Sequence, residues 1–203
     1  MPDKNSLKRD LLSLTPIDFF LKYIAKSHNW YFSEYLHTPQ DQLIDKMDLL
    51  KEIVSRNLKI GFHSLQIVGS AKTGFSLSPT HILKPFHDAA ADTKSSDIDI
   101  AVISDRLYTF WWKILRETSN AYFVSSYQQV TSSVFRGFIN EKDIMNISTI
   151  RQKWNEQISP INKTLQDELQ FVHPISYRIY RSWEDLEEYQ LKSITTAQTK
   201  LEI

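Results

Sequence analysis

The sequence predicts an α/β (α+β) protein in which helices pack on a small mixed β-sheet. Two apolar runs, residues 65–68 and 96–103, are predicted strands, and a long polar loop separates them. A third run, Ile175–Arg181, alternates apolar and polar side chains, which is typical of a strand with one buried face. Segments with apolar side chains at helical spacing flank these runs, so helices and strands are mixed along the chain.

Two helices are predicted before the first strand. Residues 1–14 form a polar lead-in that ends in a short helical turn, and Thr15 is placed to cap the helix that follows it. Aromatic side chains continue that helix to Tyr35, and we expect them to lie in the core. The second helix starts after Thr38, carries a continuous apolar stripe and ends at Gly61.

Further helices are predicted after the second strand, at residues 105–122, 147–169 and 183–194. Pro160 is expected to kink or divide the middle one, because proline cannot donate the backbone hydrogen bond that a helix needs. The pattern at residues 122–138 favours neither helix nor strand. The polar segment from Thr195 onward is expected to fray.

Length and composition predict one cytoplasmic domain over residues 1–203, made of segments 1–62, 63–104 and 105–203. The 24 basic and 24 acidic residues give zero formal charge, which provides no electrostatic footprint for non-specific nucleic-acid binding but leaves a local basic groove open. The chain has no cysteine and a polar beginning, which favours the cytoplasm, and no apolar run approaches membrane-spanning length.

The residues with clear chemistry lie around the first two strands. A glycine and a serine, Gly69 and Ser70, end the first strand, so backbone N–H groups and a hydroxyl are available to a phosphate. Asp97 and Asp99 alternate with isoleucines in the second strand and therefore share one face. Two neighbouring carboxylates repel each other, and a hard divalent cation such as Mg²⁺ or Mn²⁺ removes that cost.

This ordered pair of motifs resembles the signature of the polymerase-β-like nucleotidyltransferase superfamily: Val68-Gly69-Ser70, a spacer, then Ser96-Asp97-Ile98-Asp99-Ile100. The superfamily includes poly(A) polymerases, CCA-adding enzymes, aminoglycoside nucleotidyltransferases and small toxin–antitoxin or phage-defence enzymes. The resemblance covers about forty residues, and the spacer is longer than in many members. It implies a nucleotidyltransferase fold, a nucleoside triphosphate such as ATP as substrate, and Mg²⁺ or Mn²⁺ as cofactor.

The candidate site follows from the residues and the resemblance together. Asp97 and Asp99 are the candidate catalytic residues and metal ligands. The candidate nucleotide-binding residues are Gly69, Ser70, Lys72, Ser96 and Arg178. The loop at residues 75–94 lies between the two halves of the site in sequence, and we expect it to act as a lid or acceptor-binding loop rather than as core.

Superfamily members usually carry a third carboxylate on a later strand, and this chain departs from that pattern. The expected strand, Ile175–Arg181, offers Arg178 but no acid. Arg178 is suited to bind a phosphate, and it is equally suited to pair with a carboxylate. Asp143, Asp167 and Glu168 precede that strand and reach the site only if its boundaries differ from the prediction.

Three functional hypotheses are therefore open. The first is an enzyme that transfers a nucleoside monophosphate to an acceptor hydroxyl, on a protein, an RNA end, a small molecule or another nucleotide. The second is a catalytically degenerate nucleotide-binding module that acts through a protein partner, as in a toxin–antitoxin or defence system. The third and weakest is a phosphatase or nuclease that uses the same carboxylates.

Overall fold

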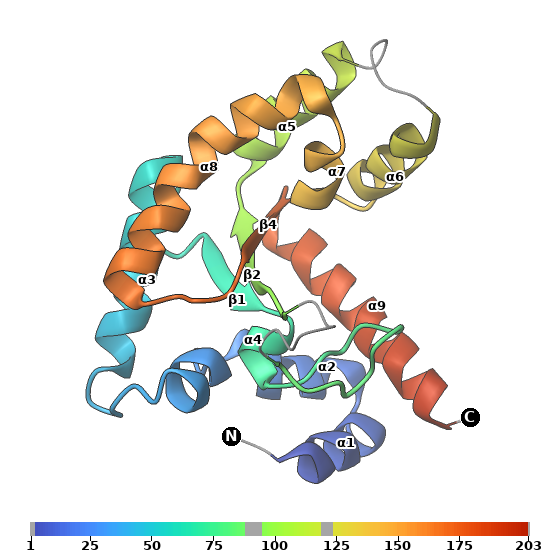
Figure 1. Ribbon diagram of the computed structural model, residues 1–203. Helices are drawn as coiled ribbons and strands as arrows, with labels where there is room; N and C mark the ends of the chain where they lie inside the picture. The colour runs from blue at the N-terminus through green and yellow to red at the C-terminus, as the bar shows by residue number, and fades with distance from the viewer. Residues whose placement is uncertain (1–2, 88–94, 119–123, 203) are drawn as a thin grey trace. The chain divides into compact units, whose positions relative to one another are not determined.

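The computed structural model describes residues 3–87, 95–118 and 124–202. Within them the chain forms a mixed α+β structure, which confirms the predicted class (Figure 1). The α-helices are α1 (Lys4–Ser13), α2 (Pro16–Phe20), α3 (Leu43–Leu58), α4 (Ser70–Thr73), α5 (Asp105–Glu117), α6 (Val124–Phe135), α7 (Glu141–Met145), α8 (Ser148–Leu169) and α9 (Trp183–Glu202). Two π-helical segments are η1 (Leu21–Ala25) and η2 (Tyr31–Tyr35). In these ranges no helix has both the length and the apolarity needed to cross a bilayer.

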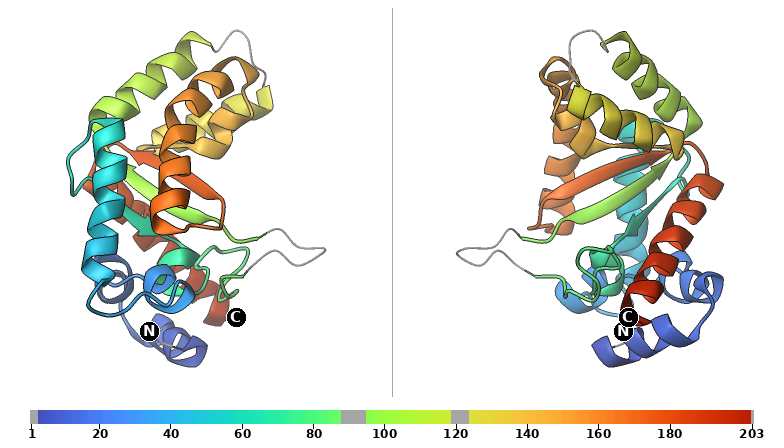
Figure 2. Two further views of the ribbon diagram at one scale, coloured as in Figure 1. Left: turned by 60° about the vertical axis from the view of Figure 1, so that its left-hand side comes forward. Right: turned by 90° about the vertical axis from the view of Figure 1, so that its right-hand side faces the viewer.

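One four-stranded sheet holds β1 (Leu65–Val68), β2 (Ile98–Ile103), β3 (Phe138–Asn140) and β4 (Ile175–Tyr180), in the order β1-β2-β4-β3 (Figure 2). The predicted strand at residues 175–181 is confirmed as β4. It pairs antiparallel with β3, so that Phe138 lies opposite Tyr180. At the end of β2 the Ile103 N–H donates to the Ser64 carbonyl at 2.8 Å, so β1 and β2 also run antiparallel.

The chain divides into two compact units. The first contains Met1–Met47, Ile67–Asp99 and Glu187–Ile203. The second contains Asp48–Gln66 and Ile100–Leu186. Both units are assembled from segments that are distant in sequence, and a single domain over the whole chain stays a prediction.

In the first unit, α1 and α2 lie beside α9 (Figure 1). The Gln198 side chain joins the two ends of the unit, because its Nε2 donates to the carbonyls of Leu11 and Leu14 at 2.8 and 2.9 Å. The buried residues of this core are Leu7, Leu11, Phe19, Phe20, Ile24, Leu77, Leu83, Ile194 and Ala197.

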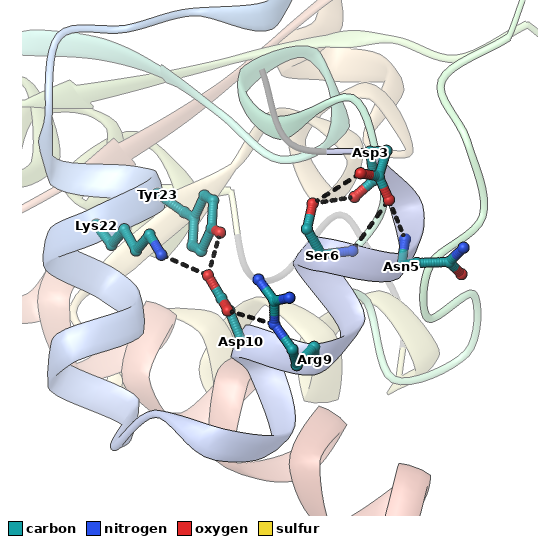
Figure 3. A network of polar contacts seen from close by, with 7 residues as sticks. All are labelled: Asp3, Asn5, Ser6, Arg9, Asp10, Lys22 and Tyr23. Atoms are coloured by element: carbon teal, nitrogen blue, oxygen red, sulfur yellow. Dashed lines mark hydrogen bonds and ion pairs between the residues drawn. The ribbon is translucent and has the colours of Figure 1, made fainter.

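A polar network fastens α1 to η1 in the same unit (Figure 3). The Asp10 carboxylate, 7% exposed, accepts hydrogen bonds from Lys22 Nζ at 2.5 Å and from the Tyr23 hydroxyl at 2.6 Å. Arg9 Nε donates to its other oxygen at 3.4 Å. These donors, Lys22 foremost, lower the pKa of Asp10 to about 2, so the carboxylate is charged at neutral pH.

The second unit has a core of large aromatic side chains. Trp111 and Trp154 meet edge to face, with ring centroids 4.9 Å apart. Glu141 is the first residue of α7, and its carboxylate accepts hydrogen bonds from Trp154 Nε1 and from the Tyr177 N–H, each at 2.7 Å. These bonds supply the partners that a buried indole and the start of β4 require.

The N-terminal helices differ from the prediction. The Thr15 cap is confirmed, since its Oγ1 accepts from the Asp18 N–H at 3.2 Å. The helix does not continue unbroken to Tyr35, because the backbone becomes extended at Lys26. Asn29 then starts a new turn by accepting from the Tyr31 N–H at 3.0 Å through its side chain.

At the C-terminal side one expectation is corrected and one further strand is found. The fraying predicted from Thr195 is wrong, because α9 continues to Glu202 and buries Ala197 completely. Pro160 lies inside α8, a single helix of 22 residues, so the helix is not divided there and the kink stays a prediction. The short strand β3 was not predicted, since three residues are too few to show a periodicity.

The loop after α4 is also corrected over its described part. Phe75 bridges to Pro85, and Leu77 and Leu83 are buried in the core of the first unit. This part of the loop is therefore anchored in the core through Leu77 and Leu83, which the prediction of a lid did not include. The rest of the predicted loop includes residues 88–94, which lie outside the described residues.

Candidate functional site

The close approach of Gly69 and Asp99 is the centre of the candidate site. Gly69 has φ 67° and ψ −151°, a conformation that glycine adopts without strain. A Cβ added there would lie 2.7 Å from Asp99 Oδ2, closer than real contacts allow. The absence of a side chain at Gly69 therefore lets the Asp99 carboxylate pack against the backbone that begins α4.

The two aspartates alternate with buried isoleucines, as the sequence predicts. Asp97, directly before β2, and Asp99, within it, are partly exposed, whereas Ile98 and Ile100 are completely buried. The isoleucines hold the strand in the core and leave the carboxylates on the accessible side. This is a suitable arrangement for two oxygen ligands of one cation.

The two serines of the site are positioned differently. Ser70 is the first residue of α4 and is partly exposed. Ser96 is engaged by His87: its hydroxyl lies 3.0 Å from His87 Nδ1 and accepts from the His87 N–H at 3.2 Å. The Ser96 N–H donates to the His87 carbonyl at 3.0 Å. These bonds to His87 fix Ser96, the residue that directly precedes Asp97, and the sequence pattern did not indicate this role.

Lys72 does not extend into solvent as a phosphate ligand would. Its side chain is buried, with 3% of the residue exposed, and its ammonium group donates to the Lys26 carbonyl. Burial lowers the pKa of Lys72 to about 8, because desolvation disfavours the charged form. A nucleotide-binding role for Lys72 stays a prediction, and it requires the amine to exchange this hydrogen bond for a phosphate.

Aromatic side chains cover the end of α4, and sequence reasoning did not connect them with the site. Gly74, with φ +83°, ends α4, and a Cβ there would lie 2.8 Å from the Trp30 ring. Trp30 in turn packs on Phe86, with ring centroids 5.5 Å apart. Gly74, the next glycine after the Gly69-Ser70 turn, is the sequence signal for this contact. The Trp30 ring leaves no room for a larger residue at this position.

Arg178 lies on β4, in the second compact unit. Its guanidinium stacks over the Phe138 ring at 5.1 Å from the centroid, and Nη1 donates to the Tyr180 hydroxyl at 3.3 Å. Gly69, Ser70, Lys72, Ser96, Asp97 and Asp99 all belong to the first unit. A nucleotide-binding role for Arg178 stays a prediction.

The third carboxylate is not found among the described residues, which contain no cluster of three or more histidine or acidic side chains suited to a metal. Asp143 accepts from the Ser133 hydroxyl at 2.9 Å, within the second unit. Asp167 and Glu168, near the end of α8, belong to that unit as well. If Asp97 and Asp99 hold a cation, oxygens of water and triphosphate would complete its shell.

No family model, curated protein or solved structure matches this chain. The functional argument therefore rests on the chemistry of the residues described above.

Proposed function

We propose that this protein is a metal-dependent nucleotidyltransferase that transfers a nucleoside monophosphate from a nucleoside triphosphate to an acceptor hydroxyl. The observation that carries the proposal is the packing of the Asp99 carboxylate against Gly69. It joins two motifs that a long spacer separates in sequence. A glycine turn and paired carboxylates are the parts that phosphoryl-transfer chemistry requires in one place.

Each residue has a defined role in this proposal. Asp97 and Asp99 hold Mg²⁺ or Mn²⁺, which supplies charge neutralisation on the triphosphate when bound. The backbone at Gly69 and the hydroxyl of Ser70 orient the terminal phosphates. The acceptor oxygen forms a bond to the α-phosphorus while the bond from that phosphorus to the bridging oxygen breaks. Pyrophosphate leaves with that oxygen, and the hydroxyl proton passes to solvent.

A cytoplasmic location and a nucleotidyltransferase fold belong to the same proposal. The absence of cysteine from the sequence supports the first. The mixed sheet, with the glycine turn after β1 and the aspartates at the start of β2, supports the second.

The test combines binding with chemistry. Titration of ATP with and without Mg²⁺ should give tight binding only when the metal is present, and Asp97→Asn and Asp99→Asn should each abolish the difference. Release of pyrophosphate and incorporation of label from α-labelled ATP should follow the same pattern. Asp41→Asn, an exposed substitution in the turn before α3, is the control. Triphosphate binding that is indifferent to both the metal and the aspartates overturns the proposal.

A nucleotide-binding module without catalysis is the second candidate. The described residues offer no third carboxylate near the aspartates, which favours it. Under this alternative, ATP binds with Mg²⁺ and depends on Asp97 and Asp99, but neither pyrophosphate nor labelled product appears. The two measurements therefore separate the candidates.

A further inference from the structure

Helix α5 carries an unusual exposed surface in the second unit. Phe110 and Trp112 are 42% and 38% exposed, although large apolar rings are normally buried. A cation covers each ring: Lys153 Nζ of α8 lies 5.2 Å from the Phe110 centroid, and the Arg116 guanidinium lies 5.2 Å from that of Trp112. We name Phe110, Trp112, Lys113, Arg116 and Lys153 the aromatic–cationic face.

Helix geometry determines how these side chains are arranged. Successive residues turn by about 100°, so Phe110 and Trp112 stand on opposite sides of the exposed stripe of α5. Lys113 and Arg116 fall between them on that stripe. Trp111 points the other way, since it is buried against Trp154. The face therefore presents ring surfaces on two sides and positive charge along the middle.

The charge of this face is not neutralised within the described residues. Lys113, Arg116 and Lys153 are exposed, and none of them forms an ion pair with a described carboxylate. Cations elsewhere in the second unit do, as Arg181 does with Asp185 at 2.9 Å. The exposed acidic side chains of α5 are Asp105, in its first turn, and Glu117, at its end. Asp105 lies about two turns before Trp112, so Glu117 is the acid of α5 nearest to Lys113 and Arg116, and the three cations outnumber the acids of this helix.

We propose that the aromatic–cationic face binds single-stranded nucleic acid. Unpaired bases can stack on the accessible sides of exposed rings, and phosphates can approach the cations between them. A duplex hides the faces of its bases, so it can use only the cations. An acidic protein partner would likewise meet the charges without needing planar rings on both sides. The combination of rings and cations therefore favours a single strand.

The experiment is fluorescence anisotropy with labelled RNA and DNA oligonucleotides of about 16 nucleotides, single-stranded and as duplexes. The single strands should bind more tightly than the duplexes, and binding should weaken as salt rises from about 50 to 200 mM. Trp112→Ala should reduce affinity by about 5- to 150-fold, because one stacked base is lost. Replacing Lys113 and Arg116 by glutamine should reduce the logarithmic salt slope by about 1.4.

Matched controls are available on the same unit. Trp183→Ala removes another exposed indole, 45% exposed, and Lys163→Gln removes an exposed lysine of α8; both should leave binding unchanged. Far-UV circular dichroism and thermal melting should show that every variant is folded. Asp99→Asn should retain oligonucleotide binding, so the outcome is independent of the nucleotidyltransferase proposal.

Four results would overturn the inference. The first three are no single-strand binding at low salt, equal binding of duplex, and wild-type affinity in Trp112→Ala. Competition by polyglutamate as strong as that by the unlabelled oligonucleotide would also overturn it, and would assign the face to an acidic protein partner.

Discussion

Asp99 Oδ2 lies where a side chain on Gly69 would have to be, 2.7 Å from the position of its Cβ. Two features therefore require a glycine at position 69: its positive φ and the closeness of the Asp99 carboxylate. The two halves of the candidate site are coupled by direct packing, and a change in one half must disturb the other.

Gly69→Ala should therefore lower both stability and ligand binding. The strained backbone alone costs about 1–3 kcal/mol, and displacement of Asp99 should weaken binding of ATP with Mg²⁺. Urea unfolding and ATP titration measure the two effects. Gly61→Ala is the control, because its Cβ would meet only the Ser64 side chain, whose hydroxyl, at 2.9 Å, can rotate away. Equal stability of Gly69→Ala and wild type would contradict the structure at this turn.

Lys72→Met should change how stability depends on alkaline pH. Burial holds the folded-state pKa of Lys72 at about 8, below the ordinary 10.5, so the folded protein loses this proton first. The cost of the buried charge is complete below pH 8 and is relieved as the pH rises toward 10.5. Wild type should gain stability relative to Lys72→Met across this window in urea titrations. A constant difference between the two proteins would show that the amine is solvated.

Asp10→Asn should destabilise the first unit at neutral pH. The substitution weakens hydrogen bonds from Lys22 and Tyr23 to a charged acceptor, which costs about 1–3 kcal/mol. The folded-state pKa of Asp10 is lowered from 3.8 to about 2, so its contribution is present above pH 4 and is lost as the pH falls toward 2. The melting temperatures of wild type and Asp10→Asn should therefore converge as the pH falls toward 2. Asp41→Asn serves as the exposed control, and a gap that persists at pH 2 would argue against the network.

Leu77→Ala tests whether the loop after α4 belongs to the core. Leu77 is 8% exposed and packs in the core of the first unit, so truncation should cost about 2–5 kcal/mol. Lys84→Ala, exposed in the same loop, should change stability by less than about 0.5 kcal/mol. Unfolding in urea distinguishes the two. If both variants are equally stable, the segment is a mobile lid as its sequence suggests.

The elements that the sequence predicts well are those with a local signal. Alternation identified β4, and the Thr15 cap identified the start of α2. The misses depend on partners that are distant in sequence. Ala197 is buried because α1 and α2 lie beside α9, and nothing in the polar pattern around Thr195 shows this. Leu77 and Leu83 lie in a stretch that mixes apolar and polar residues and contains Pro79 and Pro85, so no helical or strand periodicity marks them as core.

The same distinction holds for the candidate site. The glycine turn and the aspartate pair are short local patterns, and the structure brings Gly69 and Asp99 into contact. The sequence could not show that Lys72 turns inward, because its partner, the Lys26 carbonyl, lies 46 residues earlier. It also could not show that Ser96 is held by His87, since nine positions separate the two residues in sequence.

The first unit is built from the beginning, the middle and the end of the chain, and this determines when it can fold during synthesis. Its core needs Ile194 and Ala197 as well as Leu7 and Leu11. The second unit is complete at Leu186. On the ribosome the second unit can therefore fold first. The apolar faces of α1 and α2 stay exposed to solvent until α9 emerges and packs against them. The glycine turn and the aspartates belong to the unit that closes last, so a nascent chain completes its candidate site only after α9 has been synthesised.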